Sequence, residues 1–468
     1  MPKLRGAIAG WLIAALLPGL PLGAKAAERG GQPLNVLLIT VDDLNTSLGC
    51  YGARIVRSPN IDRLAARALR FDRAYCQFPV CNPSRVSMFT GRYPETTRVL
   101  DNQQWFRDLM PDVVTLPQHF RAHGYTSARF GKLYHGGYDD AESWSEGGEP
   151  FKPKPPRTPA QQEQMYRRVN QWTAVEGDGA ELPDSRSAAE ASKFLERQRA
   201  ADRPFFLAVG FHRPHVPLAA PKRYFDHYPP ASIPLPADFA PAPAADPTVP
   251  AMAYRPNFDL FFKEEKVSPA QAREAIAAYY ASLSFMDEQV GRVLDALDRL
   301  ELRDRTVIVF VSDHGWHLGD KGMWAKATLF EASARVPLII DAPSLGHDGK
   351  SCERIVELVD LYPTLVELCG LPMPEGLEGS SLLPLMKDPA APRERPGYTV
   401  MPRSQGMGRS IRSDRWRYTE WNEGQSGAEL YDHQRDPGES RNLADDPAHQ
   451  ETRQRLKRVL ASRAQAAR

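Results

Sequence analysis

Three long apolar runs constrain the fold of this chain more than any other feature. They cover residues 35–41, 205–210 and 306–311. Continuous apolar runs of this length are typical of parallel strands buried on both faces, because a half-exposed strand would alternate apolar and polar residues. The residues that follow the runs are ionisable: Asp42, Asp43, His212, His215, Asp313 and His314. Because ligands bind at the carboxyl ends of strands in open α/β sheets, we expect these side chains to form a site.

Helical patterns lie between the apolar runs. Ser268 is followed by Pro269, the pairing favoured at a helix start, and apolar residues recur at helical spacing over 276–297. Residues 114–123 predict a shorter helix that ends at Gly124. Strands that alternate with helices indicate an α/β fold with a large, mostly parallel central sheet flanked by helices.

The pattern changes at about residue 396. Short strand-like pieces separated by turn residues occupy 410–412, 416–419 and 429–431, and a basic helical segment covers 451–464. We therefore predict a smaller antiparallel α+β subdomain over 396–468, after a catalytic domain over 27–395.

The first residues are typical of an export signal. Lys3 and Arg5 precede an apolar stretch over 6–22, and Ala24-Lys25-Ala26 forms a cleavage site. We predict a signal peptide over 1–26 and no stable membrane insertion after its removal. The alternative, an uncleaved anchor, is disfavoured because the apolar stretch is short and contains two prolines.

The overall charge limits the classes of partner. The formal net charge is only +1 over 468 residues. A general nucleic-acid binder normally carries a basic excess, so this class is disfavoured. An anionic substrate would have to meet a local basic site.

Five cysteines are present, an odd number: Cys50, Cys76, Cys81, Cys352 and Cys369. An odd count in an exported protein leaves at least one cysteine outside any disulfide. Chemical conversion of Cys81 would leave four. Whether those four form two disulfides or remain buried thiols stays open.

Two acidic pairs predict a cation site. Asp42-Asp43 and Asp313-His314 each follow a predicted buried strand. Carboxylates brought together would repel one another unless a cation lies among them, and oxygen-rich sites favour Ca²⁺ or Mg²⁺. The alternative for an isolated Asp-Asp pair is a loop or a helix cap.

Cys81 begins the segment Cys-Asn-Pro-Ser-Arg. Pro83 suits the first turn of a helix that continues to Thr90. A nucleophile at a helix N-terminus lies among free N–H groups, which favour negative charge. Arg85, four residues on, would lie on the same helix face.

The Cys-x-Pro-Ser-Arg segment, followed by Thr90-Gly91-Arg92, resembles the signature of the sulfatase family. The resemblance implies that a formylglycine-generating enzyme oxidises Cys81 to formylglycine. It also implies that one Ca²⁺ is bound by Asp42, Asp43, Cys81, Asp313 and His314.

Further sulfatase-like stretches carry four more candidate residues. Lys132 and His135 lie in FGKLYHGG, His215 in GFHRPHVP and Lys326 in KGMWAKATLFE. By composition alone, the stretch with Lys132 would be a strand that leads into a solvated turn. The resemblance implies that Lys132, His215 and Lys326 contact the sulfate ester and that His135 lies beside formylglycine.

The resemblance implies a mechanism in which hydrated formylglycine attacks sulfur. Asp313 would take the proton of the attacking hydroxyl, and His215, aided by Lys326, would protonate the departing alcohol. His135 would remove the proton of the second hydroxyl, so that sulfate leaves and the aldehyde returns. A Cys81→Ser variant would lack that second hydroxyl and permit at most one slow turnover.

Several stretches are similar to the iduronate-2-sulfatase branch, among them RVSMFTGRYPETTR, FFLAVGFHRPHVP and SDHGWHLGD. They predict a sulfated-sugar substrate of the iduronate-2-sulfate type. Arg213 and Arg409 are candidates for binding the uronate carboxylate. The chain departs from the pattern at Asn82, where alanine is common, and in its proline-rich loops over 147–159 and 229–250, where specificity is usually set.

Three alternatives remain open. The first is a choline-, aryl- or other carbohydrate-sulfatase, and the second is a phosphonate or phosphodiester hydrolase with the same machinery. The third is a sulfated-glycan-binding protein in which Cys81 stays unconverted. The sequon at Asn45 abuts Asp42-Asp43, where a glycan would obstruct the site. We therefore favour a bacterial periplasmic or secreted protein over a lysosomal one.

Overall fold

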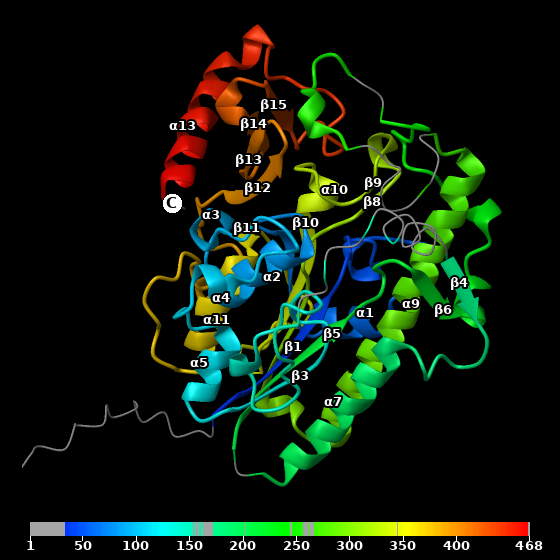
Figure 1. Ribbon diagram of the computed structural model, residues 1–468, viewed down its shortest axis with the longest axis vertical. Helices are drawn as coiled ribbons and strands as arrows, with labels where there is room; N and C mark the ends of the chain where they lie inside the picture. The colour runs from blue at the N-terminus through cyan, green and yellow to red at the C-terminus, as the bar shows by residue number, and fades with distance from the viewer. Residues whose placement is uncertain are drawn as a thin grey trace, which may run out of the picture. The chain divides into compact units, whose positions relative to one another are not determined.

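The computed structural model describes most of the chain after residue 32 (Figure 1). It describes residues 33–466 apart from 153–154, 156–157, 159–160, 162–171, 202, 244–245, 256–261, 263–265 and 344. The predicted signal peptide over 1–26 lies outside the described residues, as do parts of the two proline-rich loops.

A seven-stranded sheet forms the centre of the described chain, in the order β11-β2-β10-β7-β1-β5-β3. Strand β1 (Asn35–Val41) pairs in parallel with β5 (Phe205–Phe211) and β7 (Thr306–Ser312). The other strands are β2 (Leu69–Tyr75), β3 (Thr126–Gly131), β10 (Arg335–Asp341) and β11 (Ser351–Glu357). In this sheet only β10 runs antiparallel to its neighbours. The mostly parallel sheet is confirmed, and the three apolar runs are adjacent strands at its centre.

Helices cover both faces of this sheet (Figure 1). One face packs against α1 (Pro59–Ala65), α7 (Pro183–Arg199) and α9 (Pro269–Arg299), and the other against α2 (Cys81–Thr90), α5 (Leu116–Ala122) and α11 (Leu361–Leu368). Leu37 and Ile39 of β1 belong to the first core, and Val36 and Leu38 to the second. Burial on both faces explains why the β1 sequence is apolar without alternation.

The two predicted helix starts have capping boxes. In α9, the Ser268 side chain accepts a hydrogen bond from the backbone of Gln271, whose side chain returns to Ser268. Thr115 and Gln118 form the same arrangement at α5. Helix α5 therefore begins two residues later than the pattern indicated.

The C-terminal segment forms an antiparallel sheet and a helix. Its strands are β12 (Gly397–Arg403), β13 (Gly406–Arg412), β14 (Trp416–Trp421) and β15 (Ala428–Asp432), and α13 (Gln450–Ala466) follows. Strand β12 was absent from the sequence prediction. It joins the rest of the chain through hydrogen bonds from Val400 N to Gln77 O (2.9 Å) and from Thr399 Oγ1 to Cys76 O (2.7 Å). The boundary between the catalytic domain and the C-terminal subdomain, placed between residues 395 and 396, remains our proposal.

Short elements complete the described chain. They are α3 (Pro94–Thr97), α4 (Phe106–Leu109), β4 (Trp172–Val175), β6 (Leu218–Pro221), α8 (Lys222–Phe225), β8 (His317–Leu318), β9 (Trp324–Ala325), α10 (Glu331–Ala334) and α12 (Leu383–Lys387). Single 3₁₀ turns are η1 (Gly49–Tyr51), η2 (Ala141–Ser143), η3 (Pro230–Ser232), η4 (Ala251–Ala253), η5 (Arg303–Arg305), η6 (Asp320–Gly322), η7 (Leu358–Asp360), η8 (Asn422–Gly424) and η9 (Pro447–His449). All five cysteines are free thiols. Among the described helices, none has the length and apolar character to cross a membrane.

Candidate active site

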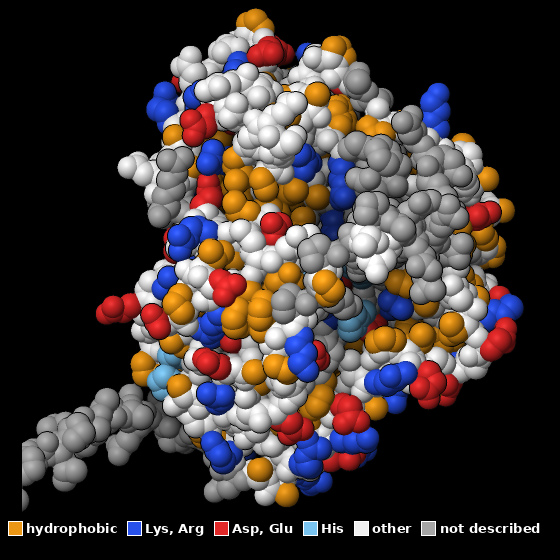
Figure 2. Space-filling model, viewed as in Figure 1, with side chains coloured by type: hydrophobic (Ala, Val, Ile, Leu, Met, Phe, Trp, Pro, Cys, Tyr) orange, Lys and Arg blue, Asp and Glu red, His pale blue; other side chains and the backbone are white. Residues whose placement is uncertain are grey.

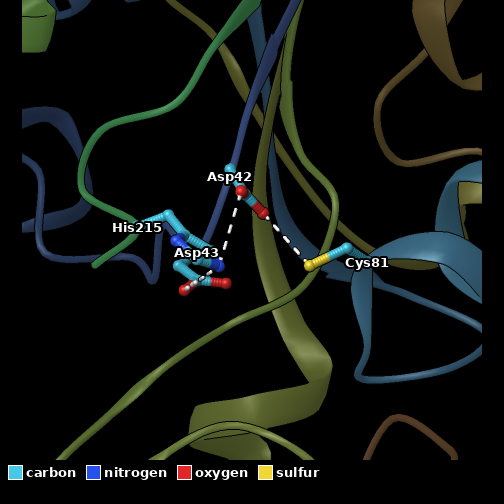
Figure 3. Close-up of side chains that lie close together, drawn as sticks. All are labelled: Asp42, Asp43, Cys81 and His215. Carbon is cyan, nitrogen blue, oxygen red and sulfur yellow. Dashed lines mark hydrogen bonds and ion pairs between the residues drawn. The ribbon is translucent and has the colours of Figure 1, made fainter. Parts of the chain in front are cut away.

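Cys81 is the first residue of α2 and lies at the carboxyl edge of the central sheet. Its Sγ lies 3.3 Å from Asp42 Oδ1, 3.0 Å from Lys326 Nζ and 3.5 Å from His314 Nε2. Figure 3 shows the thiol facing the Asp42 carboxylate. The side chain is buried, so the helix N-terminus and these charged groups act on it with little screening by water.

Asp42 and Asp43 follow β1 and are fully buried. The Asp42 N–H donates to Phe211 O of β5 (3.2 Å), which continues the strand pairing by one residue. Asp43 turns into the left-handed region (φ 63°). The Asp43 N–H donates to Asp313 Oδ1 (3.3 Å), and Tyr279 Oη donates to Asp43 O (2.8 Å). These contacts fix the turn that presents both carboxylates.

Asp313 and Arg85 form a fully buried ion pair beneath the thiol. Arg85 Nε donates to Asp313 Oδ2 at 2.8 Å, and Arg85 Nη1 donates to Leu133 O at 2.9 Å. Asp313 Oδ1 accepts the N–H of His314 at 3.0 Å as well as that of Asp43. Both Asp313 oxygens are therefore occupied by fixed donors. The role of Asp313 as the base that takes a proton from the attacking hydroxyl remains a prediction.

Two lysines neutralise the paired carboxylates. Lys132 Nζ contacts Asp42, and Lys326 Nζ contacts both Asp43 and Cys81. Burial and the Asp42 carboxylate oppose ionisation of Cys81, but Lys132 and Lys326 outweigh them and the pKa of the thiol is lowered. The two ammonium groups thus favour negative charge at the position of the Cys81 side chain.

The acidic cluster has the donor set of a divalent cation site. Ligand atoms within 4.8 Å of one another come from Asp42, Cys81, Asp313 and His314, and in a second, overlapping set from Asp42, Asp43, Cys81 and His215. The buried Asp43 Oδ2 has no hydrogen-bond partner in the described chain. Burial, with the Asp42 charge beside it, raises the pKa of Asp43 to about 8 even though Lys326 opposes this. A bound cation would give Asp43 Oδ2 a partner and would favour the ionised carboxylate. These residues therefore fit a divalent cation.

The imidazole of His314 has a fixed orientation toward this cluster. Its Nδ1 lies 3.0 Å from Gly315 O, and its Nε2 lies 3.4 Å from Asp43 Oδ1 and 3.6 Å from Asp313 Oδ1. When Nδ1 carries the proton and donates to the carbonyl, Nε2 is left as a ligand atom.

His215 approaches the cluster from the loop after β5. Its Nδ1 lies 2.6 Å from Val216 O, and its Nε2 lies 3.9 Å from Asp42 Oδ2 and 3.8 Å from Asp43 Oδ2 (Figure 3). Burial lowers the pKa of this imidazole well below its ordinary value, although Asp42 opposes the shift. The loop is held by Asp184, whose carboxylate accepts the N–H groups of His212 and Arg213 at 2.8 and 2.9 Å.

A close contact between backbones positions Lys132 after β3. A Cβ at Gly210 would lie 1.9 Å from Lys132 O, and a Cβ at Gly131 would lie 2.1 Å from Gly210 O. Glycine at both positions lets this segment run against β5. His135 follows in the wall of a 380 Å³ pocket that Lys132 and His212 also line. Its Nδ1 is buried without a partner in the described chain, and burial with Lys132 lowers the pKa of His135 to about 3.

The two arginines considered for a uronate carboxylate have other partners. Arg213 Nε donates to Ala219 O (3.0 Å) and its Nη1 to His215 O (3.2 Å), so it braces the His215 loop. Arg409 Nε pairs with Glu95 at 2.9 Å. The sequence did not reveal the supporting roles of Asp184 and Tyr279, because neither lies in a motif and both act across long sequence separations.

The fold and this site define the class of protein. Residues 34–371 match the sulfatase family, and residues 319–466 match the C-terminal region of N-sulphoglucosamine sulphohydrolase. The chain belongs to the sulfatase family and is a sulfuric ester hydrolase.

Particular relatives are similar over most of their length. Human iduronate 2-sulfatase is 35% identical, with 86% of this chain and 87% of the relative covered. Choline-sulfatase of Rhizobium meliloti is 31% identical over 89% of this chain and 83% of the relative. A solved phosphonate monoester hydrolase from Silicibacter pomeroyi has a TM-score of 0.75 at 27% identity and covers 93% of this chain and 96% of its own.

Proposed function

We propose that this protein hydrolyses a sulfate ester on a sugar, of the iduronate-2-sulfate type, with a formylglycine derived from Cys81 and one bound Ca²⁺. One observation carries the proposal: the Cys81 side chain lies at a helix N-terminus between buried carboxylates and the ammonium groups of buried Lys326 and half-buried Lys132. This arrangement favours a nucleophile attacking a negatively charged ester.

Asp42, Asp43, Asp313, His314 and residue 81 would bind the calcium ion. When bound, Ca²⁺ supplies positive charge that favours the ionised form of the nucleophile and offsets the charge of the ester. The orphaned Asp43 Oδ2 and the oriented His314 Nε2 support this assignment.

Formylglycine supplies two hydroxyl groups on one carbon when its aldehyde is hydrated, one to attack sulfur and one whose deprotonation allows sulfate to leave. A formylglycine-generating enzyme would be the maturation partner. Arg85, locked by Asp313 and by the Leu133 carbonyl, would hold residue 81 in place through its Nη2, which has no hydrogen-bond partner in the described chain.

The remaining residues would bind the ester and move protons. Lys132 and Lys326 would neutralise sulfate oxygens, and His215 would deliver a proton to the leaving alcohol from Nε2, since its Nδ1 is engaged with Val216 O. The low pKa of His135 keeps its imidazole neutral, and its buried Nδ1, which has no hydrogen-bond partner in the described chain, would accept a proton from residue 81.

The sugar assignment rests on the similarity to iduronate 2-sulfatase over most of both chains. An exported location, periplasmic or secreted, is part of the proposal. The side-chain amide of Asn45 donates to Trp316 O (3.0 Å) and accepts the Ser47 N–H (3.0 Å). The sequon asparagine is therefore engaged inside the fold, which argues against a glycan there and favours a bacterial over a lysosomal location.

A phosphonate monoester hydrolase is a second candidate, favoured by the likeness to a solved enzyme of that kind. Choline sulfate is a further candidate substrate, since a choline-sulfatase is 31% identical.

A substrate panel tests the proposal. Purified protein, matured in a host with the formylglycine-generating enzyme, is assayed with iduronate-2-sulfate disaccharide, choline sulfate, 4-nitrophenyl sulfate and a matched phenyl phosphonate ester. We expect the highest kcat/KM for the sulfated sugar, with released sulfate measured by ion chromatography and a Cys81→Ala control. A higher kcat/KM for the phosphonate would replace the proposal with the second candidate.

A further inference from the structure

Three half-buried aromatic rings lie in series beside the active-site pocket. Trp105 stacks on Phe151, with ring centroids 4.1 Å apart and an angle of 12° between the rings, and Tyr138 meets Phe151 edge-on at 5.6 Å. The Tyr138 ring lies 6.2 Å from the ring of His135, which lines the 380 Å³ pocket together with Lys132. All three aromatic side chains stay partly exposed. The series therefore begins at the wall of the pocket that adjoins the nucleophile.

Hydrogen bonds and core packing hold the three rings in place. The Lys152 N–H, next in sequence to Phe151, donates to Gly137 O (2.9 Å). Trp105 Nε1 donates to Asp139 O (3.3 Å), and the Trp105 ring packs against the core on the α2 face of the sheet. The two accepting carbonyls flank the tyrosine in sequence. The three segments that carry the rings are thus joined to one another before any ligand binds.

Asn82, where the chain departs from the common signature, fixes the loop that leads into Trp105. Its side-chain amide donates to Asp101 O (2.9 Å) and Gln104 O (2.8 Å), and its backbone N–H donates to Asn102 Oδ1 (3.0 Å). Figure 2 shows hydrophobic side chains at the surface over the α2 and α4 region of Figure 1, where this loop lies. The start of α2 therefore positions both the nucleophile and the loop that carries the first ring.

Fixed, partly exposed aromatic rings beside a polar pocket are suited to bind a sugar ring. The face of an aromatic ring is negative, so it attracts the C–H groups on the apolar face of a pyranose. Rings that are already ordered lose little entropy when a ligand binds. Trp105 and Phe151 cover one face of each other, so they offer a flat surface. A quaternary ammonium such as choline is bound better by a cage of several ring faces.

We propose that Trp105, Tyr138 and Phe151 form a sugar-stacking platform, which binds the pyranose joined to the sulfated sugar. The inference rests on the proposed function and deepens it. The platform selects substrates of at least two sugar units over a sulfated monosaccharide. Asn82 is a positioning residue, because it acts on the platform through the loop that leads into Trp105.

Matched substrates with and without a second pyranose test the platform. A 2-sulfated iduronide carries the second pyranose at O1 or at O4, and its counterpart carries a methyl group at that position. In wild-type protein, kcat/KM is expected to be higher for the disaccharide at one of these positions. Trp105→Ala and Phe151→Ala are each expected to lower this ratio roughly 10-fold, because each removes an aromatic stacking contact. A general loss of activity, or of Cys81 conversion, cancels in the ratio.

The positioning residue has its own variants. Asn82→Ala should lower the ratio by roughly 3- to 10-fold, through KM of the disaccharide more than through kcat, because the loop loses two hydrogen bonds. Asn82→Asp keeps the size of the side chain but not its amide donors, so it should not restore the ratio. Phe225→Ala is the matched control: it removes a half-buried ring that packs against the core on the opposite face of the sheet, and should leave the ratio unchanged.

The outcomes distinguish the two proposals. If each disaccharide and its methyl counterpart have equal kcat/KM in wild-type protein, or if the ratio survives in Trp105→Ala and Phe151→Ala, the platform is wrong and the proposed function stands. If Trp105→Ala lowers kcat/KM for 4-nitrophenyl sulfate by the same factor as for the disaccharide, the platform binds an aryl group and the second sugar is wrong. If wild-type protein releases sulfate from none of the sugars, the proposed function fails and the platform fails with it.

Discussion

Two clusters among the described residues contain the residue types of a metal site, and protein donors satisfy their carboxylates to different degrees. One is the active-site cluster at the ends of β1 and β7. The other, the subdomain cluster, consists of Glu331, His433 and Glu439, where α10 meets the C-terminal sheet.

In the subdomain cluster, every carboxylate has fixed donors. Arg417 pairs with both Glu331 and Glu439, Tyr75 Oη donates to Glu331 Oε1 (2.9 Å), and the Glu331 N–H donates to Glu439 Oε2 (2.8 Å). Burial opposes ionisation of Glu439, but Arg417 outweighs it and the pKa of Glu439 falls to about 2. Arg412 Nε lies 3.5 Å from Glu331 Oε2 as a second cation, so two arginines match the two carboxylates.

In the active-site cluster, Asp43 keeps an oxygen that accepts no hydrogen bond from any described residue, and burial raises its pKa to about 8. The comparison teaches that ligand types alone do not identify a metal site. What distinguishes the two clusters is whether protein donors already satisfy the carboxylates.

The largest expected effect is loss of the nucleophile. Cys81→Ala should lower kcat by about 10⁴- to 10⁶-fold, as removal of a covalent nucleophile does elsewhere, with little change in melting temperature. Turnover and a circular dichroism melt measure both. Residual activity within 100-fold of wild type would contradict the role of residue 81.

Calcium removal should show which of the two clusters binds the ion. Chelation should lower turnover by about 10³-fold, because a catalytic cation contributes several kcal/mol to the barrier, and added Ca²⁺ should restore it. Elemental analysis should find one Ca²⁺ per chain, less in Asp313→Asn and unchanged in Glu439→Gln. The reverse pattern would assign the ion to the subdomain cluster.

The lysine that touches the thiol should affect the reaction and not the fold. Lys326→Met is expected to lower kcat by roughly 10²- to 10³-fold, because a fixed charge beside the developing anion is lost. Lys193→Met, which removes a surface lysine paired with Glu190, is the control. Equal kcat in both variants would argue against an electrostatic role for Lys326.

The subdomain cluster should affect the fold and not the reaction. Arg417→Met removes the cation that Glu331 and Glu439 share. Among the described residues it leaves them only Arg412 (3.5 Å) and His433 (3.0 Å) as ion-pair partners, so the free energy of unfolding should fall by about 3 kcal/mol. Chemical unfolding measures this change, and kcat per folded molecule should stay near wild type. A stable but inactive variant would contradict the comparison.

The smallest effect is expected at the pair of Arg415 and Asp432, at the end of β15. Arg415→Gln should change the free energy of unfolding by about 1 kcal/mol, because the Arg415 side chain reaches water and the buried Asp432 keeps the Gln434 N–H as a donor (3.2 Å). A larger loss would show that the C-terminal sheet depends on more than its buried network.

Local sequence patterns were sufficient for the fold around the site. The apolar run of β1 and the capping residue Ser268 each depend on neighbours within a few positions, so their structure could be predicted. The start of α2 at Cys81 follows in the same way from Pro83. The roles assigned to Lys132, His135 and His215 came from the resemblance and remain predictions.

Contacts between distant segments could not be predicted from local patterns. Strand β12 was missed because its first residues follow a proline-rich stretch. The contacts of Arg403 with Met252 and Ala327 cross 151 and 76 residues, so no spacing rule could reveal them. The subdomain cluster likewise unites residues from α10 and from beyond β15, and only the folded chain brings them together.

The most direct test of the account is the mass of the peptide over residues 73–85 from an enzymatically active preparation. Conversion of cysteine to formylglycine lowers the mass by about 18 Da, since oxygen replaces sulfur and two hydrogens are lost. We predict that the converted fraction and the specific activity rise in proportion across preparations. Full activity in a preparation whose residue 81 is entirely unmodified cysteine would contradict the account.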